Sequence, residues 1–314
     1  MSGSKIGLRP KSVKLIALIG ALLVSVAWGT SFLSSKVLII DGGFTPVEVF
    51  VYRFTLAYFI LFIFTARKIL SNNIKDELLL LVCGLCAGSI YFVSENYALQ
   101  YTAAGNVSLL VSISPIFTTI FMAIIYKFMP KPNVIIGSII AFIGVTCIIL
   151  SAGESFEINP LGDIIALSAS VSWAIYTIVV KRLTPIYSTI FITRKLFFYG
   201  VISALPLLLI QRQPYHLAQI FDSNNSIYLY NFLFLGLVCS ALAYLIWNDV
   251  MKILGSIKTN NLLYLQPLIT MIAGAYLLGE TVYFLGYVGC FLIIGGIIIS
   301  DKLSMGSKRD SKCF

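Results

Sequence analysis

Ten long apolar stretches follow one another along this sequence, and they constrain its fold more than any other feature. Each stretch has about the 20 apolar residues that an α-helix needs to cross the hydrocarbon core of a bilayer. Only short breaks separate them, so there is no room for a separate soluble domain. We expect an all-α, polytopic membrane protein with ten transmembrane helices at residues 13–35, 46–66, 78–97, 103–126, 133–152, 161–181, 187–210, 228–249, 256–279 and 283–302.

Two pairs of neighbouring stretches are divided by very short breaks. The third and fourth are divided at Tyr101-Thr102, and the ninth and tenth at Glu280-Thr281. One helix running through both members of a pair would be far longer than a hydrocarbon core of about 30 Å. We therefore expect a tight helical hairpin at each of these two places.

The composition agrees with a protein whose solvent is lipid. Apolar residues make up 59% of the 314 residues and charged residues 11%, whereas a soluble domain carries about 25% charged residues. The net charge of +9 would suggest nucleic acid in a soluble protein. Here the basic residues fall in short loops and tails, so we assign them to membrane topology and expect no nucleic-acid partner.

The positions of Lys and Arg predict the orientation. If the N-terminus is cytoplasmic, most of the 22 basic residues fall on the cytoplasmic side, and only Lys36 and Arg212 fall in outside loops. Cytoplasmic loops carry the excess of Lys and Arg, and a wrong helix count would destroy this alternation. We expect a multi-pass protein of the cell (inner or plasma) membrane, with cytoplasmic tails at residues 1–12 and 303–314.

The second half of the chain is a diverged copy of the first. Ala21–Leu38 and Ala166–Leu183 share Ala, Leu, Ser, Val, Trp, Lys and Leu at equivalent positions. Because each copy holds five helices, the second enters the membrane from the opposite side, and residues 13–152 and 161–302 are expected to form two inverted repeats. Further equivalent pairs are Trp28/Trp173, Arg53/Arg194, Asn96/Asn248, Pro115/Pro267, Gly137/Gly289 and Gly144/Gly296.

Several of these motifs resemble those of EamA-type transporters, which belong to the drug/metabolite transporter superfamily. Trp28-Gly29-Thr30-Ser31 is similar to the W-G-x-x-[FW] opening of that family, and Pro46 with Arg53-Phe54 resembles its second-helix pattern. The family's fourth-helix pattern is similar to Ala98-Leu99-Gln100-Tyr101-Thr102 followed by Pro115. Its ninth-helix pattern is similar to Leu265-Gln266-Pro267 followed by Leu278-Gly279-Glu280.

The resemblance covers nearly the whole chain and implies a secondary transporter with two EamA-like repeats. Such a protein moves a small metabolite by alternating access, as export or facilitated exchange. The sequence departs from the family pattern at Lys127-Phe128, where Gly-Glu is frequent, and at Ala174, where a glycine is expected. These departures leave the fold unchanged and weaken the claim that the halves are functionally equal. The first helix also lacks the acidic residue that small four-helix multidrug members use for proton coupling.

Two arginines lie within predicted helices at equivalent depths. An intramembrane Arg costs at least about 2.5 kcal/mol unless it is paired or hydrated. Glu95 lies at a depth similar to that of Arg53, and Asp249 is the corresponding candidate for Arg194. Two interpretations stay open. The pairs could be ion bridges that pin each half, or they could gate the cavity or hold a substrate carboxylate, for which Arg offers a bidentate fork.

Polar and aromatic residues inside the helices are candidates for lining a cavity. Such groups hydrogen-bond across helices or to a ligand, and both readings stay open. A lone Trp would indicate an interfacial belt, but the two repeated tryptophans stand among Ser, Thr and Tyr. Pro115 and Pro267 can bend their helices and would suit a rocking motion. The candidate lining residues are Trp28, Thr30, Ser31, Asn96, Asn106, Ser112, Trp173, Tyr176, Asn248, Tyr264 and Gln266.

An intramembrane enzyme and a channel or receptor are the alternative classes. The single histidine, His216, falls in a predicted outside loop, and the sequence has neither an H-E-x-x-H motif nor a nucleotide-binding loop. Cys83 and Cys86 match C-x-x-C by spacing alone and are read as packing residues. We therefore expect no enzyme, catalytic residue, metal or cofactor.

The expected partners are a small metabolite and the lipid bilayer. Tyr, Trp and Arg in polar stripes suit a zwitterionic or aromatic metabolite such as an amino acid. The sequence leaves the cargo, the transport direction, the coupling ion and the choice between monomer and homodimer open.

Overall fold

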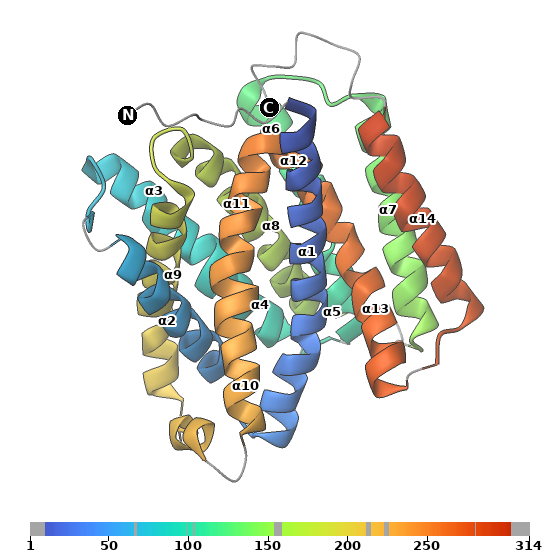
Figure 1. The fold of residues 1–314 in the computed structure, drawn as a ribbon. Helices are drawn as coiled ribbons and strands as arrows, with labels where there is room; N and C mark the ends of the chain where they lie inside the picture. The colour runs from blue at the N-terminus through green and yellow to red at the C-terminus, as the bar shows by residue number, and fades with distance from the viewer. Residues whose placement is uncertain are drawn as a thin grey trace.

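The chain forms one bundle of helices (Figure 1). The computed structural model describes residues 10–65, 68–98, 100–102, 104–153, 159–211, 215–222, 226–279 and 281–302. Within these ranges all regular elements are helical and no β-strand occurs, so the predicted all-α class is confirmed. The predicted tail segments 1–9 and 303–314, together with Arg212 and Glu280, lie outside the described residues.

The first repeat supplies five crossings, of which the third and fourth are irregular. The regular ones are α1 (Pro10–Lys36, continued by the π-helical η1, Val37–Asp41), α2 (Pro46–Thr65) and α7 (Pro132–Ser151). The irregular ones are α3 (Ile74–Gly84), π-helical η2 (Leu85–Ser89) and α4 (Ile90–Ala98), then α5 (Ala104–Val111) and α6 (Ser114–Tyr126).

The second repeat follows the same plan. Its regular crossings are α8 (Pro160–Leu183), α9 (Thr189–Ile210) and α14 (Phe284–Lys302), with the 3-10 turn η3 (Leu217–Phe221) after α9. Its irregular crossings are α10 (Ile227–Leu233), π-helical η5 (Phe234–Leu242) and α11 (Ala243–Leu254), then α12 (Ser256–Asn261), η6 (Leu262–Tyr264) and α13 (Leu265–Leu278).

Nine helices of the described residues are long and apolar enough to cross a membrane. The remaining crossing is the ninth in chain order, which the 3-10 turn η6 divides into α12 and α13. Pro267 lies just after this turn and cannot donate the backbone hydrogen bond that a continuous α-helix would need. Pro115 lies at the equivalent place, near the start of α6 and just after α5 has ended. The ten-crossing plan is thus kept, with its fourth and ninth members broken.

Two helix ends differ from the predicted ones for identifiable reasons. The third crossing begins at Ile74, four residues before the expected start, because the Asn73 side chain accepts a hydrogen bond from Asp76 N and caps a polar first turn. The eighth crossing continues to Leu254, beyond the expected end at residue 249. It ends where Gly255 takes φ 88°, a conformation that costs glycine little.

The two repeats are inverted and interlock. α1 of the first repeat packs on α11 and α13 of the second, and α8 packs in the same way on α4 and on α5 and α6. α2 packs on α9, and α7 packs on α14, which Figure 1 shows running side by side. The core therefore forms mainly between repeats, and the inverted arrangement expected from the two sequence copies is confirmed.

Paired glycines show this symmetry in detail. A Cβ added to Gly137 would lie 2.5 Å from Gly296 O, and one added to Gly144 would lie 2.7 Å from Gly289 O. Gly137 is the repeat equivalent of Gly289, and Gly144 that of Gly296, so the pseudo-two-fold axis exchanges the two contacts. Small residues here allow the backbones of α7 and α14 to approach closely.

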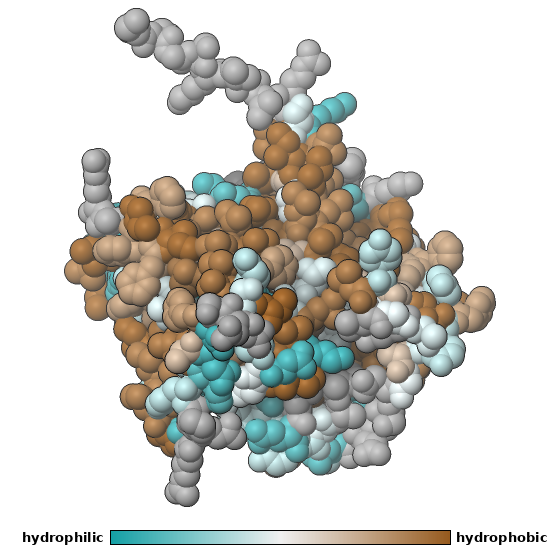
Figure 2. Space-filling view, turned by 60° about the horizontal axis from the view of Figure 1, so that its bottom comes forward, coloured by the Kyte–Doolittle hydropathy of each residue, from teal (hydrophilic) through white to brown (hydrophobic). Residues whose placement is uncertain are grey.

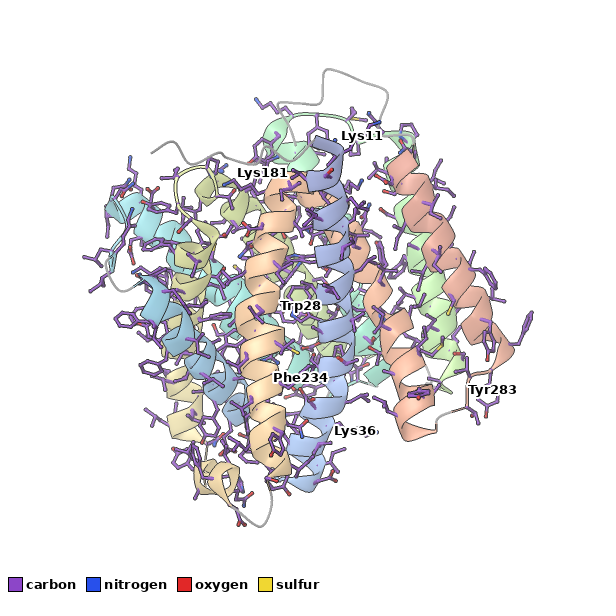
Figure 3. The ribbon with its side chains drawn as sticks, viewed as in Figure 1. Lys11, Trp28, Lys36, Lys181, Phe234 and Tyr283 are labelled. Carbon is purple, nitrogen blue, oxygen red and sulfur yellow. The ribbon has the colours of Figure 1, made fainter. Side chains whose placement is uncertain are left out.

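The surface suits a membrane. Apolar side chains cover the sides of the bundle, whereas hydrophilic ones gather on the end that Figure 2 brings forward. Lys11 and Lys181 lie at the opposite end, and Lys36 and Tyr283 lie at the forward end (Figure 3). Because α1 begins and α14 ends at the same end (Figure 1), the chain crosses the bundle an even number of times, as a multi-pass membrane protein.

Candidate functional site

Aromatic side chains from both repeats meet in the middle of the bundle. The ring centroid of Trp28 on α1 lies 5.8 Å from that of Trp173 on α8, 5.4 Å from Tyr244 and 5.0 Å from Trp247 on α11. Tyr91 on α4 lies 5.6 Å from Trp173. We call these five residues the central aromatic cluster, and Figure 3 places Trp28 at mid-height of the bundle. The expected repeat pair Trp28/Trp173 is thus brought into direct contact.

Hydrogen bonds hold most of these rings in place. Trp28 Nε1 donates to Cys239 O at 2.8 Å, in the π-helical segment η5, and Trp173 Nε1 donates to Asn260 Oδ1 at 2.8 Å. The π-helical geometry leaves main-chain carbonyls available to side chains, and such segments are frequent at functional sites. Trp247 Nε1 is buried without a hydrogen-bond partner among the described residues. An unmatched buried donor requires an explanation, and a ligand acceptor would supply one.

Arg53 lies beside this cluster with one end of its guanidinium group unengaged. Its Nε donates to Ser240 Oγ at 3.0 Å, and its Cζ lies 5.4 Å from the Phe54 ring centroid and 5.2 Å from that of Phe92. No hydrogen bond joins its two Nη groups to a described residue. The planar guanidinium is held through its Nε and by two aromatic rings, and its two Nη groups are suited to binding a carboxylate.

Glu95, on α4, lies within electrostatic reach of Arg53, yet the expected ion bridge is absent. Ser240, and not the carboxylate, takes the Arg53 Nε hydrogen bond. Glu95 has no hydrogen-bond partner among the described residues and keeps part of its surface exposed. The structure therefore brings the two charges near each other without pairing them.

Arg194 has a different environment from the one expected. Its Nη1 donates to Thr65 O at 2.7 Å, and its Nη2 donates to Lys68 O at 2.6 Å and Ile69 O at 3.2 Å. Thr65 is the last residue of α2, and Lys68 and Ile69 lie in the connection that follows it, so the guanidinium ties this connection to the end of the helix. The expected pairing with Asp249 is wrong, because Asp249 is exposed on α11 while Arg194 turns to the end of α2.

A matching clamp holds the other end of the bundle. Buried Glu48, at the start of α2, accepts hydrogen bonds from Thr45 N at 2.8 Å and His216 N at 2.8 Å, and His216 Nδ1 lies 3.2 Å from it. At the Arg194 end, Lys195 forms an ion pair with Glu77. α2 and α9 are repeat equivalents, so each secures a connection that belongs to the other repeat.

A buried polar layer lies next to the cluster at the end that carries Lys11 and Lys181. Asn260 links Trp173 to Ser256 O, and Asn261 Nδ2 donates to Ser300 Oγ at 2.7 Å. These side chains are buried, whereas Ser94, Glu95 and Asn96 on α4 keep exposed surface.

The other predicted lining residues do not form a single cluster. Tyr176 and Asn248 do meet, with Tyr176 OH donating to Asn248 Oδ1 at 2.6 Å and Asn248 Nδ2 donating to Thr193 Oγ1 at 3.0 Å. Tyr264 OH is buried and has no hydrogen-bond partner in the part of the chain that the structure describes. The remaining predicted lining residues form hydrogen bonds within their own stretch of chain or are partly exposed. They are Thr30, Ser31, Asn96, Asn106, Ser112 and Gln266.

Sequence reasoning missed Tyr91, Ser240, Tyr244 and Trp247. Three of these carried a signal, since Ser240, Tyr244 and Trp247 share one helix face with Asn248 at three- and four-residue spacing. The recurrent Asn248 marked that face as polar or interior, so its aromatic neighbours could have been included.

An apolar groove of about 480 Å³ lies elsewhere, between α2, α9, η5 and α11. Its lining side chains are all apolar and include none of the cluster residues. No group of His, Cys, Asp and Glu within the described ranges could hold a metal ion. The chemistry available at the cluster is therefore binding by aromatic faces, one guanidinium and one carboxylate.

Comparisons with known proteins agree with this architecture. The model of the EamA-like transporter family matches residues 15–150 and again 160–300. An "Uncharacterized transporter" of Clostridium kluyveri is 28% identical, with 88% of this chain and 90% of that protein aligned. A solved crystal structure superposes with a TM-score of 0.72 at 18% identity, covering 93% of this chain and 98% of the other. That likeness concerns the fold.

Two further relatives carry names that state a cargo. A "Probable terminal-alkyne amino-acid exporter" of Streptantibioticus cattleyicolor is 24% identical, with 95% of this chain and 98% of that protein aligned. A "Probable amino-acid metabolite efflux pump" of Salmonella typhimurium is 26% identical, with 89% and 93% aligned.

Proposed function

Because the chain belongs to the EamA-like transporter family, we propose that this secondary transporter exports a small zwitterionic metabolite of the amino-acid type. The cargo binds at the central aromatic cluster and crosses by alternating access. The two inverted repeats supply the two pseudo-equivalent states that this mechanism requires.

The observation that carries the cargo class is the unengaged fork of Arg53. Two Nη groups without a described partner match the two oxygens of a carboxylate. The cluster rings offer faces to an ammonium group, and Glu95 offers a negative charge. The spare Trp247 Nε1 donor adds a further polar anchor. A zwitterion satisfies all these groups, whereas an apolar cargo would leave them unmatched.

The names of the two amino-acid exporters among the relatives support the same cargo class and the outward direction. We also place both ends of the chain in the cytoplasm. Lys11 and Lys181 lie at the end where α1 begins (Figure 3), and cytoplasmic ends carry the excess of basic residues. In that orientation the buried Asn260 layer lies on the cytoplasmic side of the cluster, which supports an outward-facing state.

We assign the protein no enzymatic activity. His216 is the only histidine, and it is held by Glu48 at the outer clamp, away from the central cluster. The polar groups at the cluster form no pairing of a nucleophile with a general base among the described residues.

Counterflow in proteoliposomes tests the proposal. Vesicles loaded with an unlabelled amino-acid mixture are expected to take up labelled amino acids, and Arg53→Lys should reduce this exchange about 10- to 100-fold by replacing the bidentate fork with a point charge. Arg182→Gln, which removes an exposed arginine from α8, is the matched control and should exchange normally. Exchange of uncharged metabolites alone, with Arg53→Lys fully active, would refute the cargo class.

A further inference from the structure

Glu95 differs from the other acidic residues that lie inside crossings of the first repeat. Glu48 is held by His216 and Thr45, and Glu77 by Lys195. Glu95 has no such partner among the described residues, although it lies on α4 one helical turn after Tyr91 of the central aromatic cluster. An intramembrane carboxylate is costly, and one without a fixed partner indicates a group that exchanges partners.

The surroundings of Glu95 suit such an exchange. α4 packs against α8, α2, η2 and α5, yet the Glu95 side chain remains partly exposed. The charged and titratable groups that act on it are Arg53 from α2, Tyr91 one turn earlier on α4, and Tyr244 from α11. α5 carries no titratable residue, and Asp163 of α8 is engaged by Thr102. Arg53 is therefore the one fixed charge acting on this carboxylate.

We propose that Glu95 is the proton-coupling site of this transporter, at which a proton and the ammonium group of the cargo compete for one carboxylate. The inference rests on the proposed function. In the outward-facing state a proton from outside binds a Glu95 oxygen, the carboxylate becomes a neutral acid, and the cargo ammonium is released. After conversion to the inward-facing state, a new cargo ammonium displaces the proton into the cytoplasm.

This cycle balances in matter and charge. One zwitterion of zero net charge leaves the cell for each proton that enters, so one positive charge moves inward per turn. Both a pH gradient and a negative interior potential should drive export. A gradient of one pH unit should support an about tenfold cargo gradient, since one pH unit and a tenfold concentration ratio have the same free energy.

Cargo flux in proteoliposomes tests the coupling. In wild-type protein, an imposed pH gradient should concentrate cargo about tenfold per pH unit, and valinomycin with a potassium gradient should drive it further. Glu95→Gln should abolish both responses and should also lower counterflow at equal pH, because it removes the carboxylate for which the proton and the cargo ammonium compete. Asp41→Asn, which removes an exposed acid from the outer end, should respond like wild type. A gradient response in Glu95→Gln, or none in wild type, would overturn the proposal.

A measurement without cargo separates this inference from the proposed function. Trp173 touches Tyr91, one helical turn from Glu95, so the tryptophan emission should follow protonation of the carboxylate. Wild-type protein in detergent should show a one-proton transition that disappears in Glu95→Gln and remains in Asp41→Asn. If wild-type counterflow fails with every amino acid while this transition is present, the cargo class is wrong and the proton site stands. An identical titration in Glu95→Gln would refute the proton site.

Discussion

Arg53 and Arg194 occupy equivalent positions in the two repeats, but their guanidinium groups have opposite surroundings. Arg194 donates to three main-chain carbonyls at the end of α2 and just beyond it, whereas Arg53 donates only its Nε, to Ser240, and leaves its fork unengaged. The first arrangement is saturated and structural. The second is unsaturated, which is the state a binding group requires before its ligand arrives.

A second pair of equivalent positions also differs between the repeats. Asn96 and Asn248 are repeat equivalents, so the residue before each is equivalent too: Glu95 in the first half and Trp247 in the second. At this pair of positions the first repeat carries a charged side chain and the second an aromatic one. We infer that the two halves together form one asymmetric site.

The largest expected difference concerns the two arginines. Arg194→Ala should lower the free energy of unfolding by about 3 kcal/mol, because it removes three main-chain hydrogen bonds that a buried guanidinium makes at the end of α2. Arg53→Ala removes one hydrogen bond and should cost about 1 kcal/mol, while transport falls at least about tenfold. Thermal unfolding in detergent and counterflow measure the two effects. Equal destabilisation by both changes would break the comparison.

The sequence predicted the arginines' depth but not their partners. The equivalence of Arg53 and Arg194 came from the repeat and required only alignment. Which carbonyl or hydroxyl each side chain meets depends on where the α2–α3 connection folds back and on the π-helical segment η5, neither of which leaves a periodic signal. The expected acid partners failed for that reason: Asp249 shares a depth with Arg194 but lies on an exposed helix face.

The fold was more predictable because it follows from coarse quantities. Apolar length gave the number of crossings, and an odd number of helices per copy forced the inversion. Pro115 and Pro267 indicated where helices cannot continue. The clamp between Glu48 and His216 could not be foreseen, since it joins residues 168 positions apart through a connection with no repeat equivalent in sequence.

The next largest effect tests the symmetric contact between α7 and α14. Gly296→Ala would place its Cβ 2.5 Å from Gly137 O and should destabilise the protein by about 2 kcal/mol. Its neighbour Gly295 is the matched control, because a Cβ there meets nothing within 4 Å. Gly295→Ala should be neutral or stabilise by up to about 1 kcal/mol through helix propensity. Equal unfolding temperatures for the two variants would contradict the close approach.

A smaller effect distinguishes the two tryptophans. Trp28→Phe and Trp173→Phe each lose one indole hydrogen bond, so each should cost about 1 kcal/mol. Only the loss at Trp173 frees Asn260 of the buried polar layer. A cysteine replacing Ser256 should therefore react faster with a cytoplasmic thiol reagent in the Trp173→Phe background than in the Trp28→Phe background. Equal labelling rates would show that the layer does not depend on this bond.

The smallest effect concerns Lys127, where the sequence departs from the family pattern. Lys127 follows the end of α6 as its repeat equivalent Gly279 follows the end of α13. Both residues are left-handed, at φ 51° and φ 70°, and Lys127 is the only non-glycine residue of the described ranges with positive φ. A side chain makes this conformation about 1 kcal/mol less favourable than it is for glycine. Lys127→Gly should stabilise the protein by about 0.5–1 kcal/mol, and Gly279→Ala should destabilise it by a similar amount. Thermal unfolding of the two variants measures whether each change raises or lowers the stability. If Lys127→Gly instead impaired transport at unchanged stability, the exposed lysine would have a functional reason to be there, and the asymmetry between the halves would extend from the central site to the helix ends.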